Sequence, residues 1–284
     1  MKRIVSISLG SSKRNHKAEV EFRGVGFSVE RIGTDGDMDK MIAMIRELDG
    51  QVDAFGLGGI DLYLGTPAHR YTIRDGKKMV AAAQKTPIVD GSGLKDTLER
   101  LTIRHLNQEL GWDFTGKTAL LTSALDRWGM AEELEAAGCK LEIGDLIFAL
   151  GVPISMHRLR TLDRVARVLA PLAVRLPFSV LYPTGKKQEA SDGKFSRYFW
   201  GKDIIAGDYN YINKHMPSDM TGQIIITNTI TTQDVEELRR RGAKTLVTST
   251  PELSGRSFGT NVMEALLVAY AQAGSALTRD EYNQ

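Results

Sequence analysis

Segments typical of strands and of helices alternate along almost the whole of this chain. The expected strands are short and apolar, and they lie at 3–9, 28–32, 52–56, 87–89, 118–122, 140–143, 203–206, 224–227 and 245–248. The expected helices are longer and amphipathic, and they lie at 38–48, 77–84, 93–109, 129–137, 157–174, 232–241 and 261–271. Such alternation is typical of parallel sheets covered by helices, so we expect an α/β fold.

A length of 284 residues is sufficient for two domains. The expected helix at 93–109 ends close to Gly111, and a new strand follows Gly116, so we place a domain boundary near residue 112. This predicts a first α/β domain at 1–112 and a second at 113–258. We expect the last helix, within 259–274, to pack back onto the first domain.

Composition excludes several classes of protein. The net charge of +2 shows no basic excess, so we expect no nucleic acid partner. The single cysteine, Cys139, excludes an internal disulfide framework and is expected to be a buried apolar residue. No apolar stretch approaches the ~20 residues that span a bilayer. We therefore expect a cytoplasmic protein with no membrane contact.

The polar segment 185–194 is expected to be a surface loop, or alternatively a lid over a cofactor.

The segment GKTALLTSALDRWGMAEELEAAG, residues 116–138, has the order strand, turn, helix. In a dinucleotide-binding unit this order presents the backbone amides of a helix start to pyrophosphate. The small residues Ser123 and Ala124 suit such a turn, and Arg127 is a candidate partner for the phosphates. However, Gly129 is the only glycine of the turn, so the GxGxxG pattern is absent.

Asp145 strengthens the prediction of a nucleotide site. It ends the next expected strand, 22 positions after Ser123, about where a carboxylate that binds both ribose hydroxyls is expected. We therefore predict a Rossmann-like, doubly wound parallel sheet that binds NAD, because an acid at this position repels the 2′-phosphate of NADP. The alternative is that Asp145 caps the following segment. Asp126, also in the turn, would face pyrophosphate unfavourably.

Two later strand ends supply further candidate contacts to the cofactor. Gly207 and Asp208 follow one expected strand, and Asn228 and Thr229 follow the next. Ligands in open α/β sheets bind beyond the carboxyl ends of the strands. We expect these four residues on the nicotinamide side of the site.

The stretch PIVDGSGLKDTLERL, residues 87–101, resembles the segment that joins the two domains of the shikimate and quinate dehydrogenases. Asp90, Gly91 and Gly93 match an Asp-Gly-x-Gly pattern of that family, and Leu98 and Glu99 match its following helix. The order of motifs agrees over residues 52–145. The resemblance implies a substrate domain followed by a nicotinamide-binding Rossmann domain, and an NAD-dependent dehydrogenase.

The resemblance also suggests where the substrate binds. The segment SLGSSKRNH at the first strand end is similar to the serine-rich substrate segment of the family, which makes Ser11 and Ser12 candidates. His16, beside Asn15, is a candidate for contacting a substrate carboxylate. If the last helix returns to the first domain, Asn261 would also lie near the substrate.

The chain departs from the family at its catalytic lysine. The family places that lysine before the aspartate, but the corresponding segment here, 55–65, has no lysine and carries Asp61 instead. Lys77, further along, is expected to be solvated. Asp90 is therefore the one family-matched catalytic candidate, and Asp61 is a candidate base beside it, because two close carboxylates raise the pKa of one of them. The alternative for Asp90 is a turn residue, since Asp-Gly is a common turn pair.

No metal site is expected. Thr34, Asp35 and Asp37 precede the expected helix at 38–48 and suit its N-cap, the alternative being a carboxylate cluster for a divalent cation.

Three functions remain open: an NAD-dependent dehydrogenase of a hydroxylated cyclic acid of quinate or shikimate type, a two-domain dehydrogenase of a pterin-type one-carbon carrier, and a nucleotide-binding protein without redox activity. The expected partner is a small-molecule substrate, with a homodimer as an option.

Overall fold

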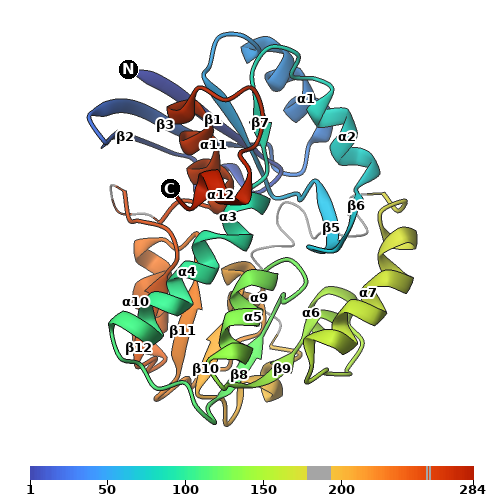
Figure 1. Cartoon of the computed structure of the whole chain (residues 1–284), viewed down its shortest axis with the longest axis vertical. Helices are drawn as coiled ribbons and strands as arrows, with labels where there is room; N and C mark the ends of the chain where they lie inside the picture. Colours follow the sequence, from blue (N-terminus) through green and yellow to red (C-terminus); the bar gives the residue numbers. More distant parts are fainter. Residues whose placement is uncertain (178–192, 254, 256) are drawn as a thin grey trace.

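Two five-stranded sheets organise the molecule, the first in the upper half of Figure 1 and the second in the lower half. The computed structural model describes residues 1–177, 193–253, 255 and 257–284 of the chain. The predicted α/β class with parallel sheets is confirmed. The loop predicted at 185–194 lies, apart from its last two residues, outside the described residues.

The first sheet has the order β2-β3-β1-β4-β7, and only β2 runs antiparallel to its neighbour. Sequence analysis did not predict β2, which pairs with β3 across a tight turn at Arg23 and Gly24, where φ is 48° and 79°. Positive φ at both turn positions matches the twist of the two strands. The strands of this sheet are β1 (Lys2–Ser8), β2 (His16–Phe22), β3 (Val25–Gly33), β4 (Ala54–Gly58) and β7 (Ile88–Val89).

Helices cover both faces of the first sheet. Because successive side chains of a strand point to opposite faces, Val5 packs into the core under α1 (Met38–Leu48) and α2 (Arg74–Val80), whereas Ile4 packs against α11 (Thr260–Ala271). The last long helix of the chain therefore covers the sheet formed by the first ninety residues, as Figure 1 shows.

The second sheet has the order β12-β11-β10-β8-β9, and its strands are all parallel. The chain adds β9 on one side of β8 and β10 on the other, so the order of winding reverses between β8 and β10. A reversal of this kind opens a crevice at the carboxyl ends of the two strands. The strands are β8 (Thr118–Leu121), β9 (Lys140–Ile143), β10 (Ile204–Ala206), β11 (Ile224–Thr227) and β12 (Thr245–Thr248).

Helices cover the second sheet on both faces as well. One core lies beneath α5 and the start of α7, and the other beneath α6, α9 and α10. The bounds of these helices are α5 (Trp128–Ala136), α6 (Asp145–Leu150), α7 (Leu159–Ala173), α9 (Tyr209–His215) and α10 (Thr232–Arg240). Cys139 is buried in the first of these cores, where burial raises the pKa of its thiol to about 11.

The single helix predicted at 93–109 is three consecutive helical segments: α3 (Ser92–Asp96), α4 (Leu98–Arg104) and η2 (His105–Glu109). The hydroxyl of Thr97 donates to the carbonyl of Gly93 at 2.8 Å, a back-bond that bends helices. Helix α4 packs against α5, so the chain reaches the second sheet before residue 112.

A small antiparallel hairpin, β5 (Tyr63–Thr66) with β6 (His69–Thr72), extends from the first half toward α7. The hydroxyl of Thr66 donates to the carboxylate of Asp163 on α7 at 2.9 Å, which links the two halves at one side. Sequence analysis did not predict this hairpin. Short segments complete the described fold: η1 (Ser12–Arg14), η4 (Ser196–Phe199) and α12 (Arg279–Tyr282).

Candidate functional site

Two cavities lie in the cleft between the sheets. The first, here called the apolar cavity, has a volume of about 200 Å³ and is lined mainly by α6, α7 and the β5–β6 hairpin. The second, here called the polar cavity, has a volume of about 170 Å³. Residues after β4 of the first sheet and after β10 and β11 of the second line the polar cavity, so strand ends from both sheets meet there. Of the described residues, four line both cavities: Asp61, Lys95, Asp126 and Tyr211.

Lys95 is the centre of the group shared by the two cavities. It lies on α3, is only 8% exposed, and its Nζ is 2.5 Å from Asp61 Oδ1 and 2.6 Å from Asp126 Oδ1. Asp61 comes from the loop after β4, and Asp126 from the turn between β8 and α5. One ammonium group therefore joins a carboxylate of the first half to a carboxylate of the second.

The electrostatics of this group leave one carboxyl able to exchange a proton near neutral pH. Burial alone would lower the pKa of Lys95, but Asp126 and Asp61 hold it above its ordinary value, so the side chain stays an ammonium. Burial, together with the neighbouring Asp126, raises the pKa of Asp61 to about 6 against the attraction of Lys95. A carboxyl with a pKa near the working pH is suited to acid–base catalysis.

Asp90 lines the polar cavity and also fixes the loop that carries Asp61. One of its carboxylate oxygens accepts from the amide of Leu62 at 2.6 Å, and the other accepts from the amide of Ser92 at 3.0 Å. Asp90 thus serves the turn, as its alternative has it, and also lines the cavity, while a catalytic role stays a prediction. Its carboxylate positions the residue next to Asp61.

The turn after Asp90 is held by α11, the last long helix of the fold. Gly91 has φ of 94°, and a Cβ on it would lie 2.5 Å from Thr260 Oγ1, so glycine is required on both counts. Glu264 on α11 accepts from the amides of Gly91 at 2.5 Å and Gly93 at 3.2 Å. Helix α11 therefore determines the direction in which α3 begins, and with it the position of Lys95.

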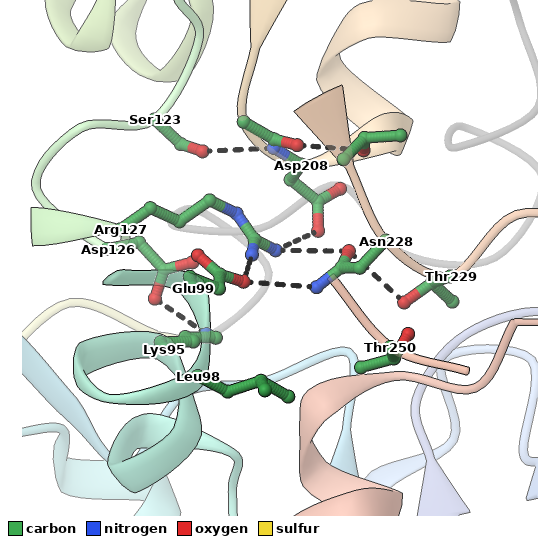
Figure 2. A network of polar contacts seen from close by, with 12 residues as sticks. Lys95, Leu98, Glu99, Ser123, Asp126, Arg127, Asp208, Asn228, Thr229 and Thr250 are labelled. Carbon is green, nitrogen blue, oxygen red and sulfur yellow. Dashed lines mark hydrogen bonds and ion pairs between the residues drawn. The ribbon is translucent and has the colours of Figure 1, made fainter. Parts of the chain in front are cut away.

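Arg127, predicted to bind pyrophosphate, is buried in a network of polar residues at the strand ends of the second sheet (Figure 2). Its guanidinium contacts Glu99 of α4, lies 3.0 Å from Asp208, and donates to Asn228 Oδ1 at 3.3 Å. Burial alone would lower the pKa of Arg127, but Glu99 and Asp208 hold it above its ordinary value. These contacts already occupy the guanidinium, and a contact of Arg127 with pyrophosphate stays a prediction; a sequence does not show that Glu99 of α4 lies beside it.

The turn after β8 uses its amides internally. Asp145 accepts from the amide of Ala124 at 2.9 Å and from that of Leu125 at 2.8 Å, and it lines the apolar cavity. Ser123 lines the same cavity and accepts from the amide of Asp208 at 3.3 Å. Asp145 thus caps the turn after β8 and not the following segment, as the alternative had it, while its carboxylate remains at the edge of the cavity.

Gly129 is not among the described residues that line either cavity, and its observed role is in packing. A Cβ on it would lie 2.7 Å from the carbonyl oxygen of Asp96, so this glycine allows α5 to approach α3 closely. Gly207, with φ of 135°, allows a similar approach between the ends of β10 and β8, because a Cβ there would clash with Thr122. Gly129 thus serves the packing of α5 on α3, and Gly207 the pairing of β10 with β8 within the second sheet.

The remaining candidates near the nicotinamide side lie at the polar cavity. Asp208, Asn228 and Thr229 all line it. Asp208 also caps α9 by accepting from the amide of Asn210 at 2.8 Å, and Thr229 has the uncommon φ of 53°. Figure 2 shows Asp208 and Asn228 on either side of the Arg127 guanidinium, with Thr229 hydrogen-bonded to Asn228.

The substrate candidates from the first half separate into two groups. Asn261 lines the polar cavity and donates to the hydroxyl of Ser6 at 2.8 Å. Ser11, Ser12 and His16 are not among the described residues that line either cavity. Ser11 caps η1, the amide of Ser12 donates to Asp35, and His16 contacts the carbonyl of Leu253 at 3.2 Å. The serines of the cavity are Ser6 and Ser8, two residues of β1 that share a face.

Sequence analysis missed Lys95 as a site residue because it sought the lysine upstream of Asp90. The only available signal was its place at the start of the helix that follows Asp-Gly-x-Gly. Glu99 was assigned only to a family pattern, although it is fully buried. A charged residue among the apolar positions of an expected helix is a weak signal of burial beside an opposite charge.

Comparison with family models identifies the chain. Residues 93–284 match the model described as "Domain of unknown function (DUF8754)". The chain belongs to this family. Residues 3–90 match a second model, described as "Domain of unknown function (DUF8753)". The two DUF models meet beside Asp90, and the DUF8754 segment includes α11, although that helix packs on the first sheet. Neither description assigns a reaction, and no curated protein matches the chain.

Solved structures resemble this DUF8754 protein only weakly, both in sequence identity and in TM-score. A dipicolinate synthase chain from Bacillus halodurans is 14% identical, with 96% of this chain and 98% of that one covered and a TM-score of 0.33. L-tryptophan dehydrogenase from Nostoc punctiforme is 12% identical, with 95% and 74% covered and a TM-score of 0.39. NAD-dependent malic enzyme from Thermotoga maritima is 12% identical, with 88% and 66% covered and a TM-score of 0.32. Overlaps this weak identify no residue of the site.

Among the described residues, no helix is both long enough and apolar enough to cross a membrane.

Proposed function

We propose that this protein is a nicotinamide-dependent oxidoreductase that interconverts an alcohol and a ketone on a small acidic molecule bound in the polar cavity. A hydroxylated cyclic acid of the quinate or shikimate type meets these requirements. The observation that carries the proposal is the Lys95–Asp61 pair where the two cavities meet. The chain lacks a lysine at the expected upstream position, yet its fold brings an ammonium and a carboxylate to within 2.5 Å of each other from α3 and the loop after β4.

The pair can perform the proton transfer of such a reaction. During oxidation the Asp61 carboxylate takes the hydroxyl proton, while the Lys95 ammonium donates a hydrogen bond to the oxygen as it becomes a carbonyl. During reduction the same proton returns from Asp61 to the oxygen. A bound nicotinamide would accept or supply the hydride, and the protein supplies orientation and proton transfer.

The described residues at both ends of the cleft suit a dinucleotide. At the apolar cavity, each Asp145 oxygen accepts one amide hydrogen bond and retains a lone pair for a ribose hydroxyl. The apolar side chains of α6 and α7 suit a planar base. At the polar cavity, Asn228 and Thr229 lie beyond the end of β11, where ligands of open α/β sheets bind.

Among the described residues, five cations and four carboxylates line the polar cavity, and the three cations other than Lys95 and Arg127 suit an acidic substrate. These cations are Arg14, Arg31 and Lys214, and the hydroxyls of Ser6 and Ser8 line the cavity with them. The guanidinium of Arg31 donates to Ser8 Oγ at 3.0 Å and to the carbonyl of Ser11 at 3.1 Å, which fixes this cation at the wall of the cavity. A carboxylate is the group that such a set of donors binds best.

Titration of the protein with NADH and NADPH, followed by nicotinamide fluorescence, tests the cofactor and its preference. We expect NADH to bind more tightly, because the Asp145 carboxylate repels a 2′-phosphate. Burial raises the pKa of Asp145 to about 6, so the titration is done well above that pH, where the carboxyl is ionised. Asp145→Asn keeps the size and one amide hydrogen bond, and should reduce the preference for NADH about tenfold.

Asp39→Ala, at an exposed position of α1, is the control and should leave both affinities unchanged. A wild-type protein that binds neither dinucleotide would overturn the proposed function. Tighter binding of NADPH than of NADH would instead show that Asp145 does not face the ribose.

The pH dependence of turnover tests the role of Asp61. Because the pKa of Asp61 is raised to about 6, its carboxylate is ionised above that pH and protonated below it. Oxidation requires the ionised form, so its kcat/KM should fall about tenfold per pH unit below about 6. Reduction requires the protonated form and should weaken as pH rises through the same value. Asp61→Asn should remove this limb from both profiles, and profiles unaffected by Asp61→Asn would exclude it as the base.

A further inference from the structure

We propose that Asp126 competes with the phosphates of the cofactor for Lys95, and thereby sets how tightly the dinucleotide binds. This inference rests on the proposed function, because it concerns how the same cleft admits its cofactor. Its basis is the contact between Lys95 of α3 and Asp126 of the β8–α5 turn, at 2.6 Å.

The position of the contact makes the competition unavoidable for a ligand that occupies both cavities. Asp61, Lys95, Asp126 and Tyr211 line the apolar and the polar cavity alike, so the junction of the cavities is at these side chains. A dinucleotide with its base in one cavity and its nicotinamide in the other must place its phosphates at this junction. Of the four shared residues, Lys95 is the cation.

The other groups of the turn are already engaged. Asp145 accepts from the amides of Ala124 and Leu125, and Arg127 pairs with Glu99 and Asp208. A phosphate that reaches this turn therefore meets an ion pair, Lys95–Asp126, rather than a set of available donors. Both a phosphate and the Asp126 carboxylate are anions that require the same ammonium.

A phosphate can displace Asp126 from Lys95. The side chain of Asp126 is 29% exposed, against 10% for that of Lys95, so the carboxylate has access to solvent while the ammonium stays fixed between its partners. Burial opposes ionisation of Asp126, but Lys95 and Arg127 hold its pKa below the ordinary value, so it is an anion at neutral pH. Once a phosphate has displaced Asp126, Lys95 donates one ammonium hydrogen to the phosphate and one to Asp61, and its third hydrogen remains for the substrate oxygen.

Asp126→Asn tests the inference, since asparagine keeps the size of the side chain and removes the charge. We expect NADH to bind about tenfold more tightly to Asp126→Asn than to the wild type in a fluorescence titration, because one like charge beside the phosphates is gone. Glu132→Gln, which removes one charge from an exposed position on α5, is the matched control and should leave the affinity unchanged.

The outcomes separate this inference from the proposed function. The inference is supported when a folded Asp126→Asn, as shown by its melting temperature, binds NADH more tightly than the wild type. It is also supported when the variant binds NADH and the wild type does not. Equal or weaker binding to a folded Asp126→Asn overturns the inference but leaves the proposed function intact when the wild type binds NADH. A failure of both proteins to bind NADH overturns both.

Discussion

Lys95→Met is expected to reduce turnover about 10²–10⁴-fold, the usual contribution of a group that assists proton transfer. Methionine keeps an unbranched side chain of similar length but removes the ammonium. The substrate oxygen then loses its hydrogen-bond donor. Asp61 and Asp126 lose the cation that lies 2.5 Å from one and 2.6 Å from the other. The measurement is kcat with the best alcohol from a screen of hydroxylated acids.

Lys77→Met is the matched control for this result. Lys77 lies exposed on α2 and is the upstream lysine closest to the position at which the family resemblance places its catalytic lysine. We expect this variant to keep wild-type turnover. Circular dichroism of Lys95→Met shows whether the variant is folded. A folded Lys95→Met with wild-type turnover would exclude the ammonium from the reaction, and with it the feature on which the proposed function depends.

Arg127→Met is expected to lower the free energy of unfolding by about 3–5 kcal/mol, because removal of one partner leaves a buried charge uncompensated. Arg127 is 2% exposed, and Glu99, its partner, is 0% exposed. The pair also joins α4 to the ends of β10 and β11 through Asp208 and Asn228, as Figure 2 shows. Urea unfolding followed by tryptophan fluorescence measures the change.

Two further variants show whether the loss of unfolding free energy comes from the buried Glu99 carboxylate that is left without its partner. The double variant Arg127→Met with Glu99→Leu replaces the pair by apolar side chains and should recover a large part of the stability. Arg240→Met breaks an exposed ion pair with Glu237 on α10 and should change stability little, since exposed pairs contribute little. Equal losses from Arg127→Met and Arg240→Met would show that burial of the network has no energetic effect.

The elements that sequence analysis located best are those with a complete local signal. Helix α1 is observed at the predicted bounds, because Asp37 accepts from the amide of Lys40 and so caps the first turn. Strands β9, β11 and β12 are also observed at their predicted bounds. Each is a short segment in a parallel sheet, followed directly by residues that begin a turn or helix. These signals involve neighbours in sequence, so they are readable without the fold.

The elements that sequence analysis missed depend on distant partners. Strand β2 alternates as expected for an edge strand, with Ala18 buried and Glu19 exposed, but its segment is rich in charge. The hairpin β5–β6 packs against α7, nearly a hundred residues further on, through Thr66 and Asp163. Local propensity is weak for such segments, and contacts remote in sequence decide their structure.

The site also combines features that neighbouring residues predict with features that contacts remote in sequence decide. The sequence by itself determined the α/β class and the approximate positions of the parallel strands, and it singled out Asp90 and Asp61 as candidates. Only the tertiary structure decided that Lys95 is the lysine of the site and that Arg127 pairs with Glu99. The physical reason is that α11 packs on the first sheet and fixes the start of α3 through Glu264, while the strand ends of the second sheet place Asp126 and Asp208 opposite it. Charges that meet across a cleft are paired by the packing of whole helices and sheets, and no spacing along the chain records that pairing.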